Sequence, residues 1–190
     1  KWECRVYLDL FAGAGCSFLR ETANRIPASP LLALGVPEPF DKYIFCEADS
    51  KKIEALKKRV HAHFPERKVA FLNINSNTSV DRILNEIPIP RKDFKVLTFC
   101  FADPYNLKNL RFSTVQKLSE RFMDFLILIP TGMDANRNVG YYVNQTNKTI
   151  DRFSGYNGWR SEWETVKGRQ SFDLFLTDLY GKMMTSLGYR

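Results

Sequence analysis

Short apolar runs alternate with amphipathic helical stretches along almost the whole chain of 190 residues. Each apolar run has the length of a buried strand, and most are followed by apolar residues at helical spacing. This alternation is typical of an α/β fold, in which crossover helices join parallel strands. The predicted strands are residues 5–10, 42–46, 69–72, 95–101 and 124–129.

The connections between these runs predict the order of the sheet. Crossovers between parallel strands are right-handed, so a doubly wound sheet would place the strands in the order 3-2-1-4-5, counted along the chain. We expect a single domain spanning residues 1–190, in which the Asn-, Gly- and Arg-rich stretch 131–170 forms an irregular cap. Helices are predicted at 31–34, where Ser29 and Pro30 form the start, at 50–63, at 79–87, from a capping box at 113–116 to about residue 122, and at 171–188.

Charge and cysteine usage narrow the class of protein. The formal net charge of +7 favours a polyanionic partner such as nucleic acid, although charge alone does not show one. No apolar run approaches the ~20 residues that span a bilayer, and no secretory signal is present, so we expect no membrane partner. The four cysteines lie far apart without metal-ligand spacing, which favours reduced thiols in a cytoplasmic protein without a metal site. The first apolar run starts almost at the first residue and the last helix ends almost at the last, so we expect a longer natural chain.

The first strand ends in a bend with two glycines, Gly13 and Gly15, preceded by Asp9. Glycine allows the backbone to turn tightly and a ligand to approach closely. The dinucleotide fingerprint G-x-G-x-x-G and the phosphate-binding G-x-x-x-x-G-K-[ST] are both absent. An acid within the strand repels phosphate and suits a cationic amino group and a sulfonium, which favours S-adenosylmethionine over a dinucleotide. Phe11 and Ala12 of the bend are included among the candidate cofactor-binding residues.

Two more candidates follow the second and third strands. Glu47, with Ala48 after it, ends the second strand, where a carboxylate commonly accepts the ribose hydroxyls of an adenosine. The alternative is an acid that caps the next helix. Asn75 follows the third strand and could bind the adenine amino group, or it could only form a turn.

The fourth strand ends at Asp103, Pro104 and Tyr105. The Asp103 carboxylate and the Pro104 carbonyl can each accept one N–H of a planar amino group, and Tyr105 can stack on its ring. These three residues are the candidate catalytic residues, because such contacts would direct the nitrogen lone pair toward a methyl donor. The alternative is an ordinary Asp-Pro turn.

The stretch 131–169 interleaves arginines and lysines with tyrosines, tryptophans and a phenylalanine. Such a mixture suits a surface that tracks a nucleic-acid backbone and stacks on bases. The alternative, which we favour, is a folded cap whose aromatic rings pack on the sheet. The lysine-rich face of 50–63 is expected to be only a solvated helix surface.

In this order, the segments DLFAGAG, FCEAD and FADPY resemble class I methyltransferases, particularly those that modify amino nitrogens of nucleic acids. More closely, the chain resembles the three-Cys-motif partner proteins nearly end to end, including ASPLLAL, FADPYN and RFSGYNGWR. The resemblance implies a Rossmann-like class I methyltransferase fold and a partner protein that bears a cysteine motif. A terminal β-hairpin, common in that fold, has no obvious segment in this sequence.

By position, the resemblance implies that Asp9, Gly13, Gly15, Glu47 and Asn75 bind the cofactor, and that Asp103, Pro104 and Tyr105 face the substrate. Two residues depart from the pattern: Asn75 stands where an aspartate is usual, and Asn106 where a glycine often follows. We therefore expect a methyltransferase acting on an amino nitrogen, with a nucleic acid as its substrate. Two alternatives stay open: a non-catalytic subunit that works with the cysteine-motif partner, and a site for another adenosine-containing ligand.

Overall fold

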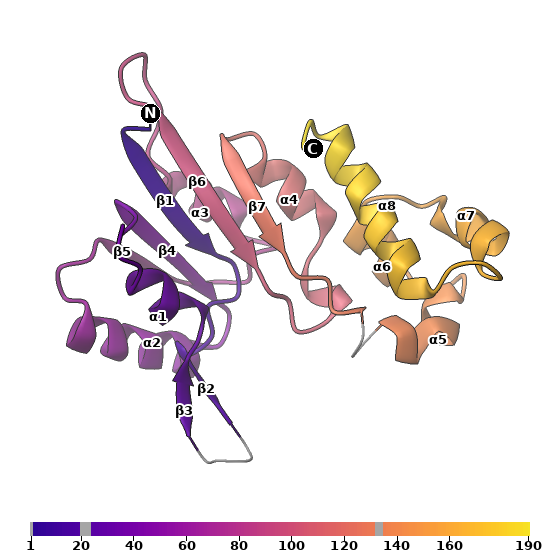
Figure 1. Ribbon diagram of the computed structural model, residues 1–190, viewed down its shortest axis with the longest axis horizontal. Coiled ribbons are helices and arrows are strands. Elements are labelled where there is room, and N and C mark those ends of the chain that lie inside the picture. The colour runs from indigo at the N-terminus through magenta and orange to yellow at the C-terminus, as the bar shows by residue number, and fades with distance from the viewer. Residues whose placement is uncertain (1, 20–23, 132–134) are drawn as a thin grey trace. The chain divides into compact units, whose positions relative to one another are not determined.

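The computed structural model describes residues 2–19, 24–131 and 135–190, which divide into two compact units (Figure 1). Unit 1 contains the described residues up to Asp103 together with Arg121–Ile127. Unit 2 contains Pro104–Glu120 and the described residues of Leu128–Arg190. In the described residues, no helix is both long enough and apolar enough to cross a membrane.

Unit 1 is built on a sheet of parallel strands, as predicted. The strands lie in the order β5-β4-β1-β6-β7, which is the third, second, first, fourth and fifth of the predicted strands. The fold is therefore a doubly wound, Rossmann-like α/β sheet. Every pair in the described part of this sheet is parallel, so no terminal hairpin is joined to β7 there. The strands are β1 (Cys4–Asp9), β4 (Lys42–Glu47), β5 (Val69–Asn73), β6 (Val96–Ala102) and β7 (Met123–Ile127).

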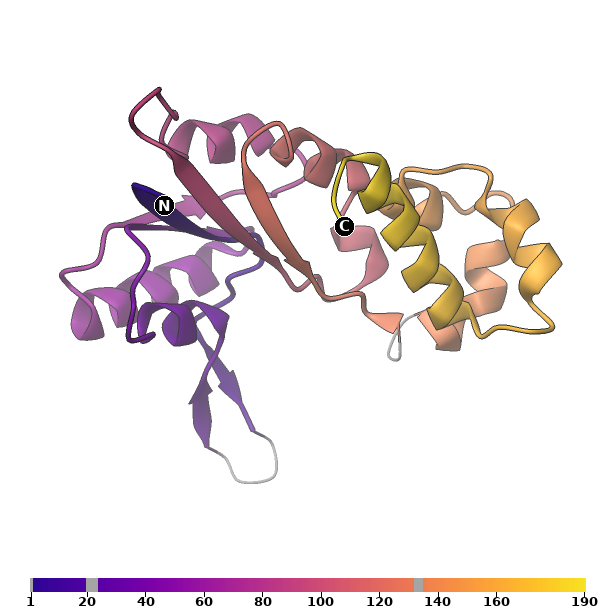
Figure 2. The ribbon, with the colours of Figure 1, turned by 45° about the horizontal axis from the view of Figure 1, so that its top comes forward.

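Helices cover both faces of this sheet. Figure 2 shows α1 (Ser29–Leu34) and α2 (Ser50–His63) on one face and α3 (Val80–Glu86) on the other. Strands β1 and β4 are almost entirely buried, which explains their nearly continuous apolar sequences, whereas β6 alternates buried and partly buried residues. On the face of α1 and α2, strand residues such as Tyr7 and Phe45 pack against Leu56 and Val60 of α2.

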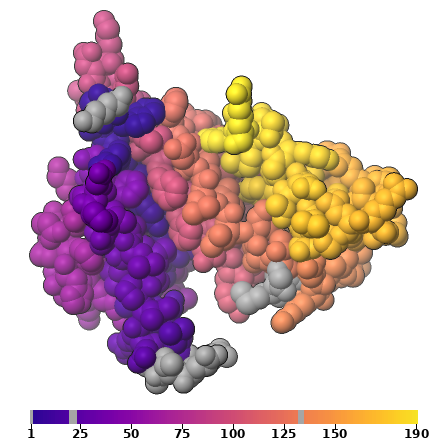
Figure 3. All heavy atoms as spheres, viewed as in Figure 1, coloured from indigo at the N-terminus to yellow at the C-terminus, as the bar shows by residue number. Residues whose placement is uncertain are grey.

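A hairpin lies between β1 and α1, where we predicted no strand. Strands β2 (Cys16–Phe18) and β3 (Arg25–Pro27) pair antiparallel and project from the rest of unit 1 (Figures 1 and 3). Most of their side chains are exposed. With no face to bury, the hairpin has no apolar alternation that could reveal it in the sequence.

Unit 2 is helical, and three α-helices lie within the described residues of 131–170, where we expected irregular structure. Trp163 of α7 packs against Phe172 and Phe175 of α8, with ring centroids 5.0 and 5.4 Å apart. This packing stabilises α7, whose eight residues are too few to show a clear period in the sequence. Unit 2 contains α4 (Phe112–Leu118), α5 (Val139–Val143), α6 (Thr149–Ser154), α7 (Trp159–Val166), α8 (Phe172–Ser186) and the 3₁₀ helices η1 (Leu107–Asn109) and η3 (Asn136–Asn138).

The predicted capping box at 113–116 is also wrong. Helix α4 begins at Phe112 after Arg111, and no side chain caps its N-terminus. Phe112 and Val115 are both buried, so the need to bury these side chains determines where the helix starts. The helix ends at Leu118, before the predicted residue 122, because the chain must enter β7 at Met123.

Candidate functional site

The register of the sheet brings three carboxylates to its carboxyl edge. Asp9 of β1 is in register with Phe45 of β4 and with Phe101 of β6. Glu47 and Asp103 each follow two residues further along those strands. Because β4 and β6 flank β1 and all three run parallel, Glu47 and Asp103 lie at the same edge, on either side of β1. The order of the strands reverses between β1 and β6, which is where ligands bind in doubly wound sheets.

The glycine bend contacts the acid at the end of β4 directly. The Gly13 N–H donates to Oε2 of Glu47 at 3.0 Å, and the Asp49 N–H donates to Oε1 at 2.8 Å. Glu47 is not the cap of α2, because Asp49 accepts the first N–H groups of that helix. Two backbone donors therefore orient the Glu47 carboxylate beside the bend.

Both glycines of the bend have left-handed backbone conformations, with φ of +61° at Gly13 and +81° at Gly15. A Cβ atom on Gly13 would meet no heavy atom within 4 Å, so the approach to its backbone is open. A Cβ atom on Gly15 would lie 2.7 Å from Cδ1 of Leu56. Gly13 therefore offers space for a ligand, whereas Gly15 allows α2 to pack closely.

Helix α2 also holds the bend through Arg59, which the sequence analysis did not identify. The Arg59 guanidinium donates to the Ala14 carbonyl at 2.6 Å. In the sequence, Arg59 directly follows Lys57 and Lys58, which belong to the lysine-rich face that we expected to be only solvated. Only its position one turn after the buried Leu56 separates it from the neighbouring lysines.

Asp9 lies behind the bend and is fully buried. Its Oδ1 accepts the Phe11 N–H at 3.0 Å, and its Oδ2 accepts the Ser29 hydroxyl at 2.7 Å. Ser29 was expected to cap α1, but the helix begins at Ser29, and its hydroxyl reaches Asp9 instead. Asp9 thus ties the bend to the start of α1.

Burial raises the pKa of Asp9 to about 6, and the nearby Asp103 charge adds to this, against the lowering effect of the Ser29 and Phe11 hydrogen bonds. The unfolded chain ionises at the ordinary value of 3.8, so between pH 3.8 and 6 the folded state binds more protons. We expect the free energy of unfolding to fall by about 3 kcal/mol as pH rises through this window. Urea titrations at several pH values should show this fall in the native chain and lose it in Asp9→Asn. An equal slope in both proteins would contradict the assignment.

The remaining cofactor candidates occupy the same edge. Phe11 is half-buried, Ala12 is buried and donates its N–H to the Cys46 carbonyl at 2.9 Å, and Ala48 is exposed. Asn75 is exposed, and its Oδ1 accepts the Asn77 N–H at 2.9 Å in a side-chain turn. A contact with adenine through Asn75 would therefore rely mainly on its NH₂ group.

The loop with Asn75 is joined to β1 by a residue that the sequence analysis missed. The Ser76 hydroxyl donates to the Leu10 carbonyl at 2.9 Å, and both residues are buried. This bond holds the loop after β5 against the end of β1. No pattern in the sequence marked Ser76, because a serine between two asparagines is typical of any turn.

The catalytic candidates lie at the point of the chain where unit 1 ends and unit 2 begins. Asp103 is exposed and is the last residue of a segment of unit 1. Pro104 and Tyr105 belong to unit 2, and Pro104 is buried. The Tyr105 side chain is 84% exposed, so its ring is not used for packing. An exposed carboxylate and an exposed ring, one residue apart in the chain, remain available to a substrate.

Most aromatic residues of 131–169 are buried, but we expected them to pack on the sheet, and the ring contacts of Phe153, Trp159 and Trp163 are instead with Tyr180 and Phe172 of α8. Tyr142, Phe153, Trp159 and Trp163 are all buried, whereas Tyr141 is 66% exposed. Exposed basic residues in this stretch include Arg137, Arg152 and Arg169.

The segment RFSGYNGWR contributes to a buried polar cluster around Asp151. Oδ1 of Asp151 accepts Nε1–H of Trp159 at 2.7 Å and Nη1–H of Arg160 at 2.6 Å. Burial alone would raise the pKa of Asp151, but the hydrogen bonds from Trp159, Arg160 and Lys148 bring it below its ordinary value. The segment therefore has a structural role in unit 2.

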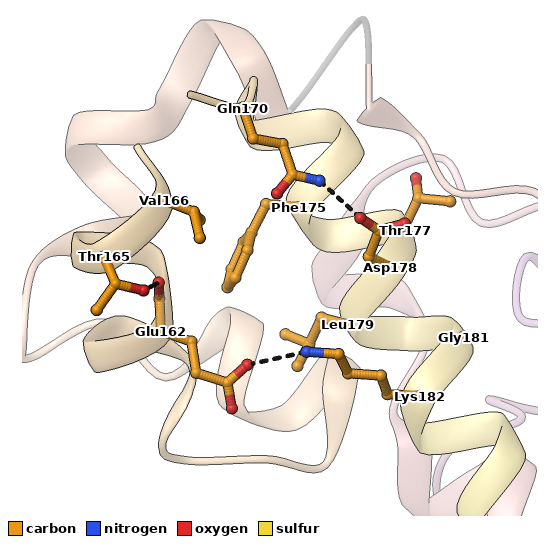
Figure 4. A pocket seen from close by; sticks show the side chains of 10 residues that line it. All are labelled: Glu162, Thr165, Val166, Gln170, Phe175, Thr177, Asp178, Leu179, Gly181 and Lys182. Atoms are coloured by element: carbon orange, nitrogen blue, oxygen red, sulfur yellow. Dashed lines mark hydrogen bonds and ion pairs between the residues drawn. The ribbon is translucent and has the colours of Figure 1, made fainter. Parts of the chain in front are cut away.

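A hollow of about 590 Å³ lies between α7 and α8 (Figure 4). Two side-chain bridges cross it: Gln170 to Asp178 at 2.6 Å and Glu162 to Lys182 at 3.3 Å. Its lining includes none of the candidate residues predicted from the sequence. It is therefore not part of the site at the edge of the sheet.

No protein-family model and no curated protein matches the chain. Among solved structures, protein LPL1258 of Legionella pneumophila is similar over 66% of this chain and 59% of that one, at 16% identity and a TM-score of 0.48. StiE O-MT is similar over 97% of this chain and 64% of its own length, at 12% identity and a TM-score of 0.39. The mycolic acid cyclopropane synthase CmaA1, in its apo form, is similar over 98% of this chain and 77% of its own length, at 12% identity and a TM-score of 0.42. The chain thus spans less than two thirds of the first two, and similarity at these TM-scores carries no weight for its activity.

Proposed function

We propose that the chain is an S-adenosylmethionine-dependent methyltransferase whose cofactor binds at the carboxyl edge of unit 1. The observation that carries this proposal is the hydrogen bond from Gly13 to Glu47. It places an open glycine backbone beside a carboxylate whose two oxygens can accept the two hydroxyls of a ribose. Each Glu47 oxygen accepts one backbone N–H and has a second lone pair, so the ribose hydroxyls can donate to the carboxylate while the backbone donors keep it oriented.

The charge of the edge favours a cationic cofactor over a dinucleotide. Asp9, Glu47 and Asp103 all lie at this edge, and the pKa of Asp9 is raised chiefly by burial and further by Asp103. Such a negative field opposes a pyrophosphate and stabilises a sulfonium and an ammonium group. The set of acceptors therefore fits S-adenosylmethionine.

Asp103, Pro104 and Tyr105 would position the substrate. The Asp103 carboxylate and the Pro104 carbonyl accept the two N–H groups of an amine and direct its lone pair, while Tyr105 stacks on the attached ring. A bound S-adenosylmethionine would supply an electrophilic methyl group and, as its methyl–sulfur bond breaks, a neutral thioether as the leaving group. Asp103 would hold the attacking amine and accept the one proton that the methylated nitrogen releases.

The finer identity of the substrate and partner is also part of the proposal. The net charge of +7 supports a nucleic acid as the carrier of the amino group. The resemblance to three-Cys-motif partner proteins supports a second protein that delivers or completes the substrate. A chain that no longer binds the cofactor would instead be a non-catalytic subunit of such a complex.

Calorimetry with S-adenosylhomocysteine tests the cofactor site. We expect the native chain to bind, and Glu47→Gln to weaken binding about 10- to 100-fold, because hydrogen bonds to a charged acceptor are lost. Glu54→Gln on the exposed face of α2 removes the same charge and should leave binding unchanged. If the native chain binds nothing at millimolar ligand, the proposal is wrong and the non-catalytic alternative gains support.

A further inference from the structure

Two adjoining hollows in unit 2 form one groove. They have volumes of about 310 and 350 Å³, and both are lined by Tyr141 and Thr149. One end includes Asn106, the residue after Tyr105, and the other end includes Arg152 of α6. The groove therefore starts beside the segment proposed to hold the substrate.

The lining of the groove is basic and polar. It contains Lys108, Lys148 and Arg152, and none of the described residues lining it is acidic. All three basic side chains are exposed, and Lys148 also lies 3.2 Å from Asp151, whose carboxylate is buried. The field in the groove therefore favours a ligand with more than one negative charge.

An aromatic ring lies where the two hollows meet. Tyr141 is 66% exposed, and its carbonyl accepts Nδ2–H of Asn147 at 3.1 Å, which holds the backbone there. Its ring contacts the buried ring of Tyr142 edge to face, with centroids 5.3 Å apart. The exposed ring is thus supported from one side and can stack on a planar group from the other.

We propose that this groove binds a single strand of nucleic acid, with Tyr141 stacked on a base and Lys108 and Arg152 each contacting a phosphate. Alternating basic and aromatic side chains match the alternating phosphates and bases of an unpaired strand. A duplex hides the faces of its bases, so a stacking ring would add nothing to its binding. The inference rests on the proposed function, because it specifies the class of substrate that the same chain would methylate.

Fluorescence anisotropy with a labelled single-stranded oligouridylate tests the groove. We expect the double variant Lys108→Ala/Arg152→Ala to bind at least about 10-fold more weakly, and its salt slope to fall by about 1.4, since each phosphate contact contributes about 0.7. Lys167→Ala/Arg169→Ala removes the same charge elsewhere in unit 2 and should change both quantities much less. Tyr141→Leu should weaken binding roughly 5- to 150-fold at an unchanged salt slope, and Tyr141→Phe should bind almost normally.

The outcomes separate this inference from the proposed function. Equal losses in the two double variants, or equal affinity for a duplex of the same length, would overturn the groove. The groove would also be overturned if the chain bound no oligouridylate at low salt but still bound S-adenosylhomocysteine. That result would leave the proposed cofactor site intact. A chain that binds oligouridylate but does not bind S-adenosylhomocysteine would support the groove and contradict the proposed function.

Discussion

Replacing Arg160 by alanine is expected to lower the free energy of unfolding of unit 2 by about 3–5 kcal/mol. The Arg160 guanidinium donates to the buried Asp151 carboxylate and lies 4.4 Å from the centre of the Trp159 ring. It also donates to the carbonyls of Val143, the last residue of α5, and of Asn144 and Asn147, which lie between α5 and α6. Its loss would leave a buried carboxylate with fewer donors and several carbonyls unsatisfied. Denaturant titration followed by circular dichroism measures the loss.

Two variants make this expectation specific to Arg160. Arg160→Lys keeps the charge but not the planar set of donors, so it should remain well below the native stability. Arg152→Ala removes an exposed arginine from neighbouring α6 and should change stability by no more than about 0.5 kcal/mol. The lowered pKa of Asp151 adds a second readout, because its stabilisation is present above pH 3.8 and is lost as pH falls through the folded value. A loss below about 1 kcal/mol in Arg160→Ala would show that the cluster is not needed.

The sheet could be predicted from the sequence because the apolar residues of each strand by themselves show that the strand is buried. Strands such as β1 and β4 are buried on both faces, so each reads as an apolar run, and the handedness of crossovers then leaves one order. Gly13 and Glu47 could be identified as candidates for the same reason, because each lies at the end of such a run. The hairpin of β2 and β3 could not be found, because its exposed side chains show no period.

The contacts that hold the site were harder to predict because they join residues far apart in the chain. Arg59 contacts Ala14 across 45 residues, and Ser76 contacts Leu10 across 66. Neither residue differs in type from its exposed neighbours, so only the fold reveals its role. In 131–170 the difficulty was different. The composition fits both a binding surface and a packed interior, and burial places most of the rings inside unit 2 and Tyr141 at its surface.

The Asp103→Ala variant is expected to transfer methyl groups about 10²- to 10⁴-fold more slowly than the native chain. Asp103 is exposed at the end of β6, at the same edge as Glu47, and contributes little packing that its loss would disturb. Its proposed tasks are to orient the amine and to accept the proton released after transfer. Asp103→Asn keeps one acceptor oxygen but not the basic charge, so its rate should lie between those of the native chain and of the alanine variant. Transfer of tritiated methyl groups from S-adenosylmethionine to mixed nucleic acid measures these rates.

Binding and catalysis should separate in this experiment. Asp103→Ala should bind S-adenosylhomocysteine about as well as the native chain, because Glu47 and the glycine bend make the ribose contacts. Asp124→Asn removes an exposed carboxylate from β7 of the same unit and should leave the rate unchanged. Undiminished transfer by Asp103→Ala would remove Asp103 from the mechanism, whereas loss of transfer together with loss of S-adenosylhomocysteine binding would assign it to the cofactor site. An Asp103→Ala variant that transfers methyl groups slowly but still binds S-adenosylhomocysteine would place Asp103 at the reacting nitrogen. A contact that strengthens in the transition state lowers the rate when it is lost, without lowering the affinity for the cofactor.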